Sequence, residues 1–226
     1  MTDAVKPPRN YDSTRRREQA AANRAAIVAA ARELFERDGF VATTITAVAR
    51  AAGVTPKTVY LGFDTKAGLL RAVWNHTLRQ EDPDRPMAQH PGVIEALEAP
   101  HPEQVLRLNA RNSRLGKLRI AHVADIIRQG APLDPDLAEL WERINSDYHA
   151  NQRLFVERLA ADGALRPELD VERATDLLWQ INHPDTWQLL VVRRGWSPED
   201  YERWSADTAC AQLLATPPSR GARRSA

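Results

Sequence analysis

Apolar residues recur at helical spacing along most of the chain, and we find no segment with the alternating pattern of a strand. Glycines, prolines and polar clusters separate the periodic segments. The pattern predicts helices over residues 23–38, 45–52, 56–61, 66–79, 103–117, 118–130, 135–162, 170–194 and 197–215. His183-Pro184 should interrupt the helix over 170–194, because proline removes a backbone donor. The predicted fold class is therefore all-α.

Two of these helices are short and follow each other closely between residues 44 and 66. Ile45, Val48, Ala49 and Ala52 fall at i, i+3, i+4 and i+7, which places them on one apolar face. Gly53 follows at the position where a helix ends in a left-handed residue, a conformation that glycine adopts without a steric clash. The pattern predicts a tight turn after the first of the two helices.

The second helix of the pair is too short to be stable alone in water. Thr55 can cap it, and Pro56 at its first position loses no hydrogen bond. Its other residues are small, polar or cationic except Val59, so we expect its neighbours to support it while its basic face points outward. That arrangement is typical of a helix-turn-helix whose second helix enters the DNA major groove.

Composition narrows the class of protein. A chain of 226 residues can form one large domain or two smaller ones. The single cysteine, Cys210, excludes an internal disulfide and a cysteine-based zinc site, and it suits a reducing compartment. No apolar run approaches the roughly 20 residues that span a bilayer, and the first residues lack the apolar core of a secretory signal. We therefore expect a cytoplasmic protein without a membrane partner.

The net charge of +1 hides an asymmetry along the chain. Residues 1–80 hold 13 Lys and Arg against 7 Asp and Glu, a formal charge of +6, whereas the remaining 18 and 23 give −5. The basic excess lies on the same side as the helix-turn-helix pattern. Chance clustering would explain it equally well, so charge alone is weak evidence for nucleic acid.

The chain divides into four expected parts. Residues 1–22 hold early prolines and few large apolar side chains, which predicts a disordered basic arm. The run Arg15, Arg16 and Arg17 is either a solvated tail or a contact to phosphates or the minor groove. Residues 23–65 would form the helix-turn-helix domain, 66–215 a helical ligand-binding and dimerisation domain, and 216–226 a disordered tail.

Residues 24–74 resemble the DNA-binding region of TetR-family transcriptional regulators. The features that carry the resemblance are Leu34-Phe35, Gly39-Phe40, Thr43-Thr44, Val48-Ala49, Ala52-Gly53-Val54, Thr58-Val59-Tyr60, Phe63, and Lys66 followed by Leu69-Leu70. The rest of the chain is similar to the family only in its layout. The resemblance implies an all-helical domain for a ligand and for dimerisation, and it names no ligand.

The resemblance also implies the residues that meet DNA. Thr44, Tyr60 and Lys66 would bind phosphates, and a hydroxyl at the start of a helix suits that role on physical grounds too. The start of the second short helix would enter the major groove through Thr55, Pro56, Lys57 and Thr58. Lys57 is the best candidate for reading a base, since an ammonium can donate to guanine O6 and N7. The chain departs from the family pattern at Ile45, which we expect to pack inside, and at Gly62.

Aromatic residues and histidines beyond the helix-turn-helix suggest two interpretations. They fill the core and an interface, or some of them line a cavity for an aromatic or hydrophobic ligand. The candidate ligand-binding residues are Trp74, His122, Trp141, Tyr148, Trp179 and His183. His122 and Asp125 share a helical face, but a metal site needs more ligands, so we expect neither a metal nor a cofactor.

The last two helices, residues 171–215, carry more apolar surface than one packed layer needs. That surface either packs on the long helix of the same chain or forms a four-helix interface in a symmetric dimer. The resemblance favours the homodimer. One helix-turn-helix also makes few contacts, whereas two on a twofold axis can read a palindromic operator.

The function predicted from the sequence is a ligand-responsive DNA-binding transcriptional regulator, a repressor in the first instance, released from its operator by a small-molecule effector. The alternatives are a constitutive DNA-binding protein without an effector, and an enzyme with an appended DNA-binding module. The enzyme would need a nucleophile with its base, or a cofactor motif. We find only scattered candidates for these, so we expect no enzymatic activity.

Overall fold

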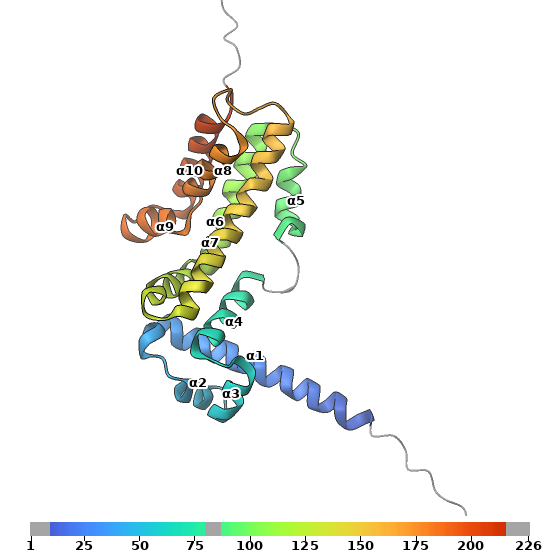
Figure 1. The fold of residues 1–226 in the computed structure, drawn as a ribbon, viewed down its shortest axis with the longest axis vertical. Helices are drawn as coiled ribbons and strands as arrows, with labels where there is room; N and C mark the ends of the chain where they lie inside the picture. Colours follow the sequence, from blue (N-terminus) through green and yellow to red (C-terminus); the bar gives the residue numbers. More distant parts are fainter. Residues whose placement is uncertain (1–9, 80–86, 216–226) are drawn as a thin grey trace, which may run out of the picture.

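The computed structural model describes residues 10–79 and 87–215, which form helices joined by short connections (Figure 1). The helices are α1 Asn10–Ala42, α2 Ile45–Ala51, α3 Pro56–Phe63, α4 Lys66–Arg79, α5 Pro91–Leu97, α6 Pro102–Gly130, α7 Pro135–Ala161, α8 Val171–Ile181, α9 Pro184–Trp187 and α10 Pro198–Leu213. Two 3-10 turns lie at Met87–Gln89 and Ala131–Leu133, and a π-helical segment, η3, spans Gln188–Arg193. The prediction of an all-α fold is confirmed.

Helix α1 is longer than the sequence predicted. It begins at Asn10, so the expected disordered arm is wrong for residues 10–22, while residues 1–9 lie outside the described part. Residues 15–26 are almost all Arg, Glu, Gln and Ala, which have high helix propensity even where nothing packs against them. The first turns of α1 project beyond the other helices in Figure 1. Near its other end Gly39 has a φ of 75°, so regular helix stops where predicted.

Helix α6 is continuous over 29 residues, where the sequence predicted two helices divided after residue 117. Lys117 was taken as the end of the first helix, but it is a core position and the buried face of α6 runs through it. Helix α5 was not predicted, because a helix of seven residues gives little periodicity and follows a proline-rich stretch. Residues 82–86 of the expected loop over 82–92 lie outside the described part, and the rest holds the 3-10 turn Met87–Gln89 and the start of α5 at Pro91.

The remaining helices agree closely with the sequence. Helices α4, α7 and α10 lie within two residues of their predicted bounds. The chain breaks between α8 and α9 at Asn182 and His183, where Pro184 cannot donate a hydrogen bond. Gly195, with a φ of 72°, ends the segment as predicted. No helix of the described ranges is long and apolar enough to cross a membrane.

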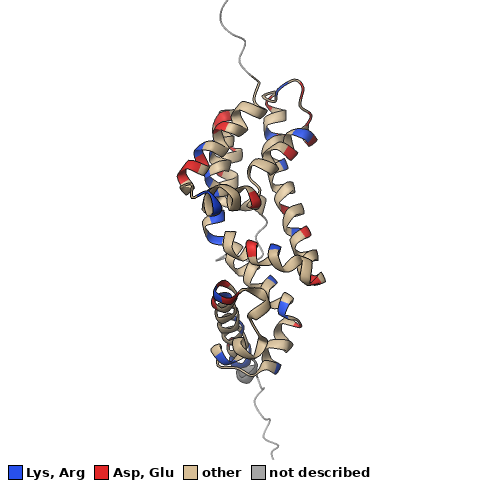
Figure 2. Cartoon of the chain, turned by 90° about the vertical axis from the view of Figure 1, so that its left-hand side faces the viewer, with Lys and Arg blue, Asp and Glu red and all other residues tan. Residues whose placement is uncertain are grey.

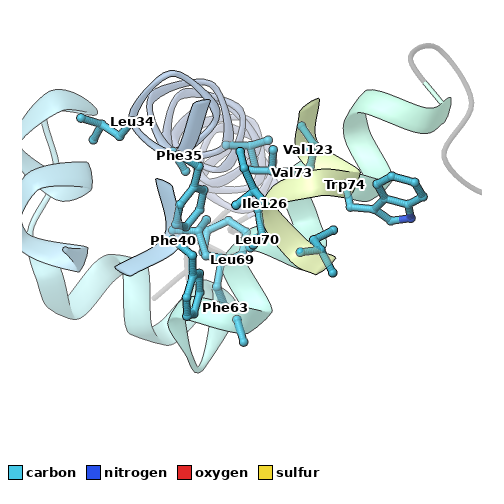
Figure 3. Close-up of a cluster of buried hydrophobic side chains, with 14 of the residues drawn as sticks. Leu34, Phe35, Phe40, Phe63, Leu69, Leu70, Val73, Trp74, Val123 and Ile126 are labelled. Atoms are coloured by element: carbon cyan, nitrogen blue, oxygen red, sulfur yellow. The ribbon is translucent and has the colours of Figure 1, made fainter. Parts of the chain in front are cut away.

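A first hydrophobic core joins α1–α4 to the second half of α6 and the start of α7. Figure 3 shows its centre, where Phe35 and Phe40 stack at 6.1 Å between ring centroids. Leu69, Leu70 and Val73 of α4 are fully buried in it. The labelled members are Leu34, Phe35, Phe40, Phe63, Leu69, Leu70, Val73, Trp74, Val123 and Ile126. Helix α4 is therefore packed at once against the helix-turn-helix and against the C-terminal half.

A second core lies at the opposite end of the molecule. It joins α5, the first half of α6, the end of α7, α8 and α10. Helices α6 and α7 run side by side through both cores (Figure 1). They therefore connect the two cores.

Candidate DNA-binding surface and candidate ligand site

The turn between α2 and α3 has the geometry that the sequence predicted. The Thr44 hydroxyl accepts a hydrogen bond from the amide of Ala47 at 3.1 Å and so caps α2. Gly53 has a φ of 68°, and its amide donates to the Arg50 carbonyl at 3.2 Å. The Val54 amide donates to the Ala49 carbonyl at 2.9 Å, which closes the turn. Local hydrogen bonds therefore fix the angle at which α3 leaves α2.

Helix α3 exposes one face and buries the other. Thr55 caps it, with its hydroxyl accepting from the Thr58 amide at 3.2 Å, and Pro56 occupies the first helical position. Val59 is fully buried. Lys57 is exposed, and so is Tyr60, with 52% of its surface accessible. The face that carries the cation points away from the protein, which is the geometry a major groove requires.

Arg24 of α1 holds the end of α3 in place, a role that sequence reasoning missed. Its guanidinium lies 4.4 Å from the centroid of the Phe63 ring, and Nη1 donates to the Gly62 carbonyl at 2.9 Å. A stacked cation and a charge-assisted hydrogen bond together fix the last turn of the helix. Arg24 and Gly62 are 38 positions apart in the sequence, so no local pattern could have indicated their contact.

Lys66 points into the fold. Its ammonium donates to the carbonyls of Phe40 at 2.8 Å, Thr43 at 3.1 Å and Val41 at 3.4 Å, and it lies 4.2 Å from the centroid of the Phe40 ring. Burial lowers the pKa of Lys66. The ammonium thus closes the end of α1 against the start of α2. Its predicted contact with a DNA phosphate stays a prediction, and this structural role stands beside it.

Charge on the helix-turn-helix is one-sided. Helices α2, α3 and α4 contain no aspartate or glutamate, and Asp64 lies in the connection between α3 and α4. Figure 2 shows basic and acidic segments interspersed over the C-terminal helices. Because α2, α3 and α4 have no carboxylates, the face that carries α3 can approach a polyanion without repulsion from acidic side chains of these helices.

A hollow of about 460 Å³ lies between α1, the end of α3 and α4. Arg24 and Phe63 line one end of it and Arg71 and His76 the other. The sequence predicted a ligand cavity in the C-terminal half instead. There, the crevice between α6, Trp141 and α9 has no room for a water molecule. The structure is therefore closed beside Trp141.

Three of the six predicted ligand residues meet in one aromatic cluster. The rings of Trp179 and His183 lie edge to face at 4.7 Å, and those of Trp141 and His183 at 6.2 Å. His149, which was not predicted, adds a ring contact with Trp179 at 6.0 Å. The cluster joins α7 to α8 and to the break before α9.

Two of the predicted ligand residues lie elsewhere. The side chain of His122 is exposed on α6, away from the cluster, and its part in a ligand site stays a prediction. Trp74 is buried in the core around α4 and makes no ring contact among the described residues. Helical spacing could not settle either position, because it shows which residues share a face and not what the face packs against.

Lys117 is a functional candidate that the sequence reasoning missed. Its side chain is 1% exposed, and its ammonium donates to the hydroxyls of Ser113 and, at 3.3 Å, of Tyr148. It lies 5.5 Å from the Tyr148 ring centroid and 5.4 Å from that of Tyr201. Burial lowers the pKa of Lys117 to about 7.

A signal for Lys117 was present in the sequence. A heptad-like stripe on α6 alternates steps of four and three residues and passes through it. All its members are buried: Leu106, Ala110, Ser113, Lys117, Ile120, Ala124 and Ile127. A lysine at a core position of an otherwise apolar stripe indicates a buried cation.

A buried polar chain continues from this region. Gln152 Oε1 accepts from Asn109 at 2.9 Å and from Asn182 at 3.2 Å. Asn182 Oδ1 and Trp179 Nε1 are buried without a hydrogen-bond partner among the described residues. Buried polar atoms are normally paired, so these two mark an incompletely satisfied site. No group of three His, Cys, Asp or Glu in the described part could hold a metal.

The fold and the exposed helix define an all-helical protein of the helix-turn-helix class. The model of the family described as bacterial regulatory proteins, tetR family, matches residues 27–73. Two regulators of Pseudomonas putida, the HTH-type transcriptional regulator TtgR and the probable HTH-type transcriptional regulator ArpR, are each 26% identical over 218 residues. Each alignment covers 91% of this chain and 98% of the relative.

A solved structure shows the same fold. NalD, the secondary repressor of the MexAB-OprM multidrug efflux pump in Pseudomonas aeruginosa, superposes with a TM-score of 0.67 at 24% identity. The alignment covers 86% of this chain and 98% of NalD. The chain therefore resembles the TetR family of bacterial regulatory proteins, by sequence over its helix-turn-helix and by fold over most of its length.

Proposed function

We propose that this chain is a transcriptional repressor that binds a palindromic operator as a homodimer and leaves it when a small molecule binds the C-terminal half. The observation that carries the proposal is the placement of α3. Its buried residues Val59 and Phe63 anchor it, while Lys57 and Tyr60 face outward from helices without acidic residues. The regulators TtgR and ArpR support the same class of function.

Seven residues would make the DNA contacts. The hydroxyls of Thr44 and Tyr60 and the ammonium of Lys66 would bind phosphates. Lys57 would read base edges from the start of α3. The full set proposed is Thr44, Thr55, Pro56, Lys57, Thr58, Tyr60 and Lys66. Because Lys66 also holds three backbone carbonyls, its contribution to DNA binding would include the positioning of α2.

The dimer would form through residues 171–215. Leu189 and Val192 of η3, in this segment, are 53% and 60% exposed in the single chain. A symmetric partner would cover them and would place a second α3 on the same face of a duplex. Two copies are needed, because the few contacts of one α3 give low affinity.

Release by an effector would act through α4. This helix shares its core with α1–α3 on one side and with α6 on the other. A ligand that favours one arrangement of α6 and α7 would therefore bias the position of α4 and the spacing of the two α3 helices. The effector would bind near the aromatic cluster around His183, where Trp141, Tyr148 and Trp179 are also found.

Selection of duplexes from a randomised pool, followed by fluorescence anisotropy, tests the DNA-binding role. Lys57→Ala should reduce the preference for the selected duplex over single-base variants about tenfold at one position. Tyr60→Phe should weaken binding by a similar factor on every duplex. Arg143→Ala on α7, an exposed position, is the control and should change neither. Failure to enrich any duplex, or uniform loss with Lys57→Ala, would contradict the proposed roles.

A constitutive DNA-binding protein is the second candidate, and the closed crevice beside Trp141 favours it. The two candidates differ in one measurable property. A repressor with an effector must have a ligand that binds the protein and changes its affinity for the selected duplex. A constitutive protein would keep that affinity with every ligand that it binds.

A further inference from the structure

Lys117 is enclosed by neutral groups on every side that packs against it. Helix α6 itself supplies the Ser113 hydroxyl, α7 supplies Tyr148, and α10 supplies the Tyr201 ring. The remaining titratable neighbour is His183, whose pKa is lowered by burial and further by the charge of Lys117. The carboxylate that faces His183, at 3.7 Å, is that of Asp185. No carboxylate of the described residues forms an ion pair with Lys117.

The hydrogen bonds of this ammonium are incomplete. It has three N–H donors, and two hydroxyl oxygens accept from it. Lys66 shows the contrast, since three carbonyl oxygens surround its ammonium. An unpaired buried charge is costly, and folded proteins normally pair it or leave it neutral. Lys117 therefore has one N–H without an acceptor and no counter-ion among the described residues.

The surroundings of Lys117 define the rest of that partner. Tyr148 and Tyr201 present ring faces to the ammonium, and the cluster of Trp141, Trp179 and His183 begins beside it. Edge-to-face ring contacts of this kind can be exchanged for contacts with an aromatic ligand at little cost. The unpaired Trp179 Nε1 and Asn182 Oδ1 lie at the edge of the same cluster, where the chain breaks between α8 and α9.

We propose that Lys117 is the anchoring residue of an effector site and that the effector is a small aromatic acid, whose carboxylate pairs with the Lys117 ammonium while its ring enters the aromatic cluster. Lys117 is 1% exposed and the crevice beside Trp141 has no room for a water molecule, so binding must move the rings around His183. The break before α9 and the π-helical segment η3 give this side of the site the least regular backbone.

Binding of such an acid adds no net charge to the protein interior. The acid can enter protonated and meet the neutral amine of Lys117. Its O–H bond breaks, the proton forms a new N–H bond on Nζ, and a carboxylate–ammonium pair results with no net charge buried. Because burial lowers the pKa of Lys117 to about 7, the neutral amine is abundant at neutral pH. An amide of the same shape has no proton to transfer and gains no such pair.

This inference rests on the proposed function, and calorimetry with two matched probes tests it. We expect naphthoic acid to bind the full-length chain at least tenfold more tightly than naphthamide. Lys117→Met keeps the length of the side chain and removes the amine, so the preference for the acid should disappear. Lys117→Gln is a second variant that keeps a hydrogen-bond donor. Arg143→Met, at an exposed position of α7, is the control and should keep the full preference.

The outcomes separate the inference from the function. Equal binding of acid and amide, no binding of either, or a preference that survives in both Lys117 variants would overturn the inference. Binding to the selected duplex is measured on the same samples. If the duplex binds and the acid does not, the effector class is wrong and the DNA-binding function stands. If no duplex binds, the function itself fails.

Discussion

Each end of this molecule has a lysine that points into the fold, and the two ammonium groups differ in how completely they are hydrogen-bonded. In the N-terminal core, Lys66 donates to the carbonyls of Phe40, Val41 and Thr43 and stacks on an aromatic ring. In the C-terminal half, Lys117 is more deeply buried and meets only two hydroxyls and two rings. The Lys66 ammonium has its acceptors within the chain and holds α1 against α2 in the helix-turn-helix. The Lys117 ammonium has an N–H available for the proposed effector.

The difference separates a part that must be rigid from a part that must respond. A helix presented to DNA needs fixed geometry before binding, so its supports are complete. A ligand site in a switch needs a group whose energy changes when the ligand arrives. Incomplete satisfaction at Lys117 supplies such a group, at a cost in stability that the well-packed remainder of the chain has to offset.

The largest effect should come from breaking the support of α3. Val59→Asp places a charge where no surface is exposed, and it should lower the free energy of unfolding by more than about 3 kcal/mol. Leu61→Asp, at a position 78% exposed on the same helix, should change it by less than about 0.5 kcal/mol. Urea unfolding measures both. Equal destabilisation would mean that α3 does not present the face described.

Replacing Lys66 should lower the free energy of unfolding by a smaller amount. Lys66→Met breaks three charge-assisted hydrogen bonds to backbone carbonyls and should cost about 2 kcal/mol of unfolding free energy. Lys57→Met at an exposed position should cost almost nothing in the same urea titration. If Lys66→Met weakened DNA binding with unchanged stability, phosphate contact would be its main role and the locking role would be wrong.

Lys117 should change how the free energy of unfolding depends on pH. The pKa of Lys117 lies near 7 in the folded chain because of burial, below its ordinary value in the unfolded chain. Between pH 7 and 9 the unfolded state therefore binds more protons, and stability rises with pH, with a slope approaching about 1.4 kcal/mol per pH unit.

The matching variant isolates that contribution. Lys117→Met should lose this rise while keeping the contributions of all other groups, including Tyr148, Tyr201 and Cys210, whose pKa values burial raises. Unfolding curves at three pH values suffice for the comparison. Parallel pH profiles of the two proteins would mean that Lys117 is solvated or paired in solution.

Local chemistry explains why the helix-turn-helix could be predicted closely. Three local features fix the turn and the start of α3: the cap at Thr55, the proline after it and the left-handed Gly53. Each acts within a few residues, so the sequence alone predicts them. Arg24 against Phe63 could not be predicted, because the two meet only after α1 packs across α3. The start of α1 was mispredicted for a different reason: its helix depends on propensity and lacks an apolar stripe.

The sequence by itself determined the helical class, the bounds of most helices and the residues that a DNA-binding turn needs, since these depend on contacts between near neighbours. Tertiary structure decided which polar groups became buried, although the stripe on α6 gave a sequence signal for Lys117. Lys117, Ser113 and Asn109 occupy core positions because α7 and α10 close over that face of α6, whereas Lys57 stays exposed because no described segment covers the outer face of α3. Burial sets the energy of a charge, and it is a property of the assembled fold.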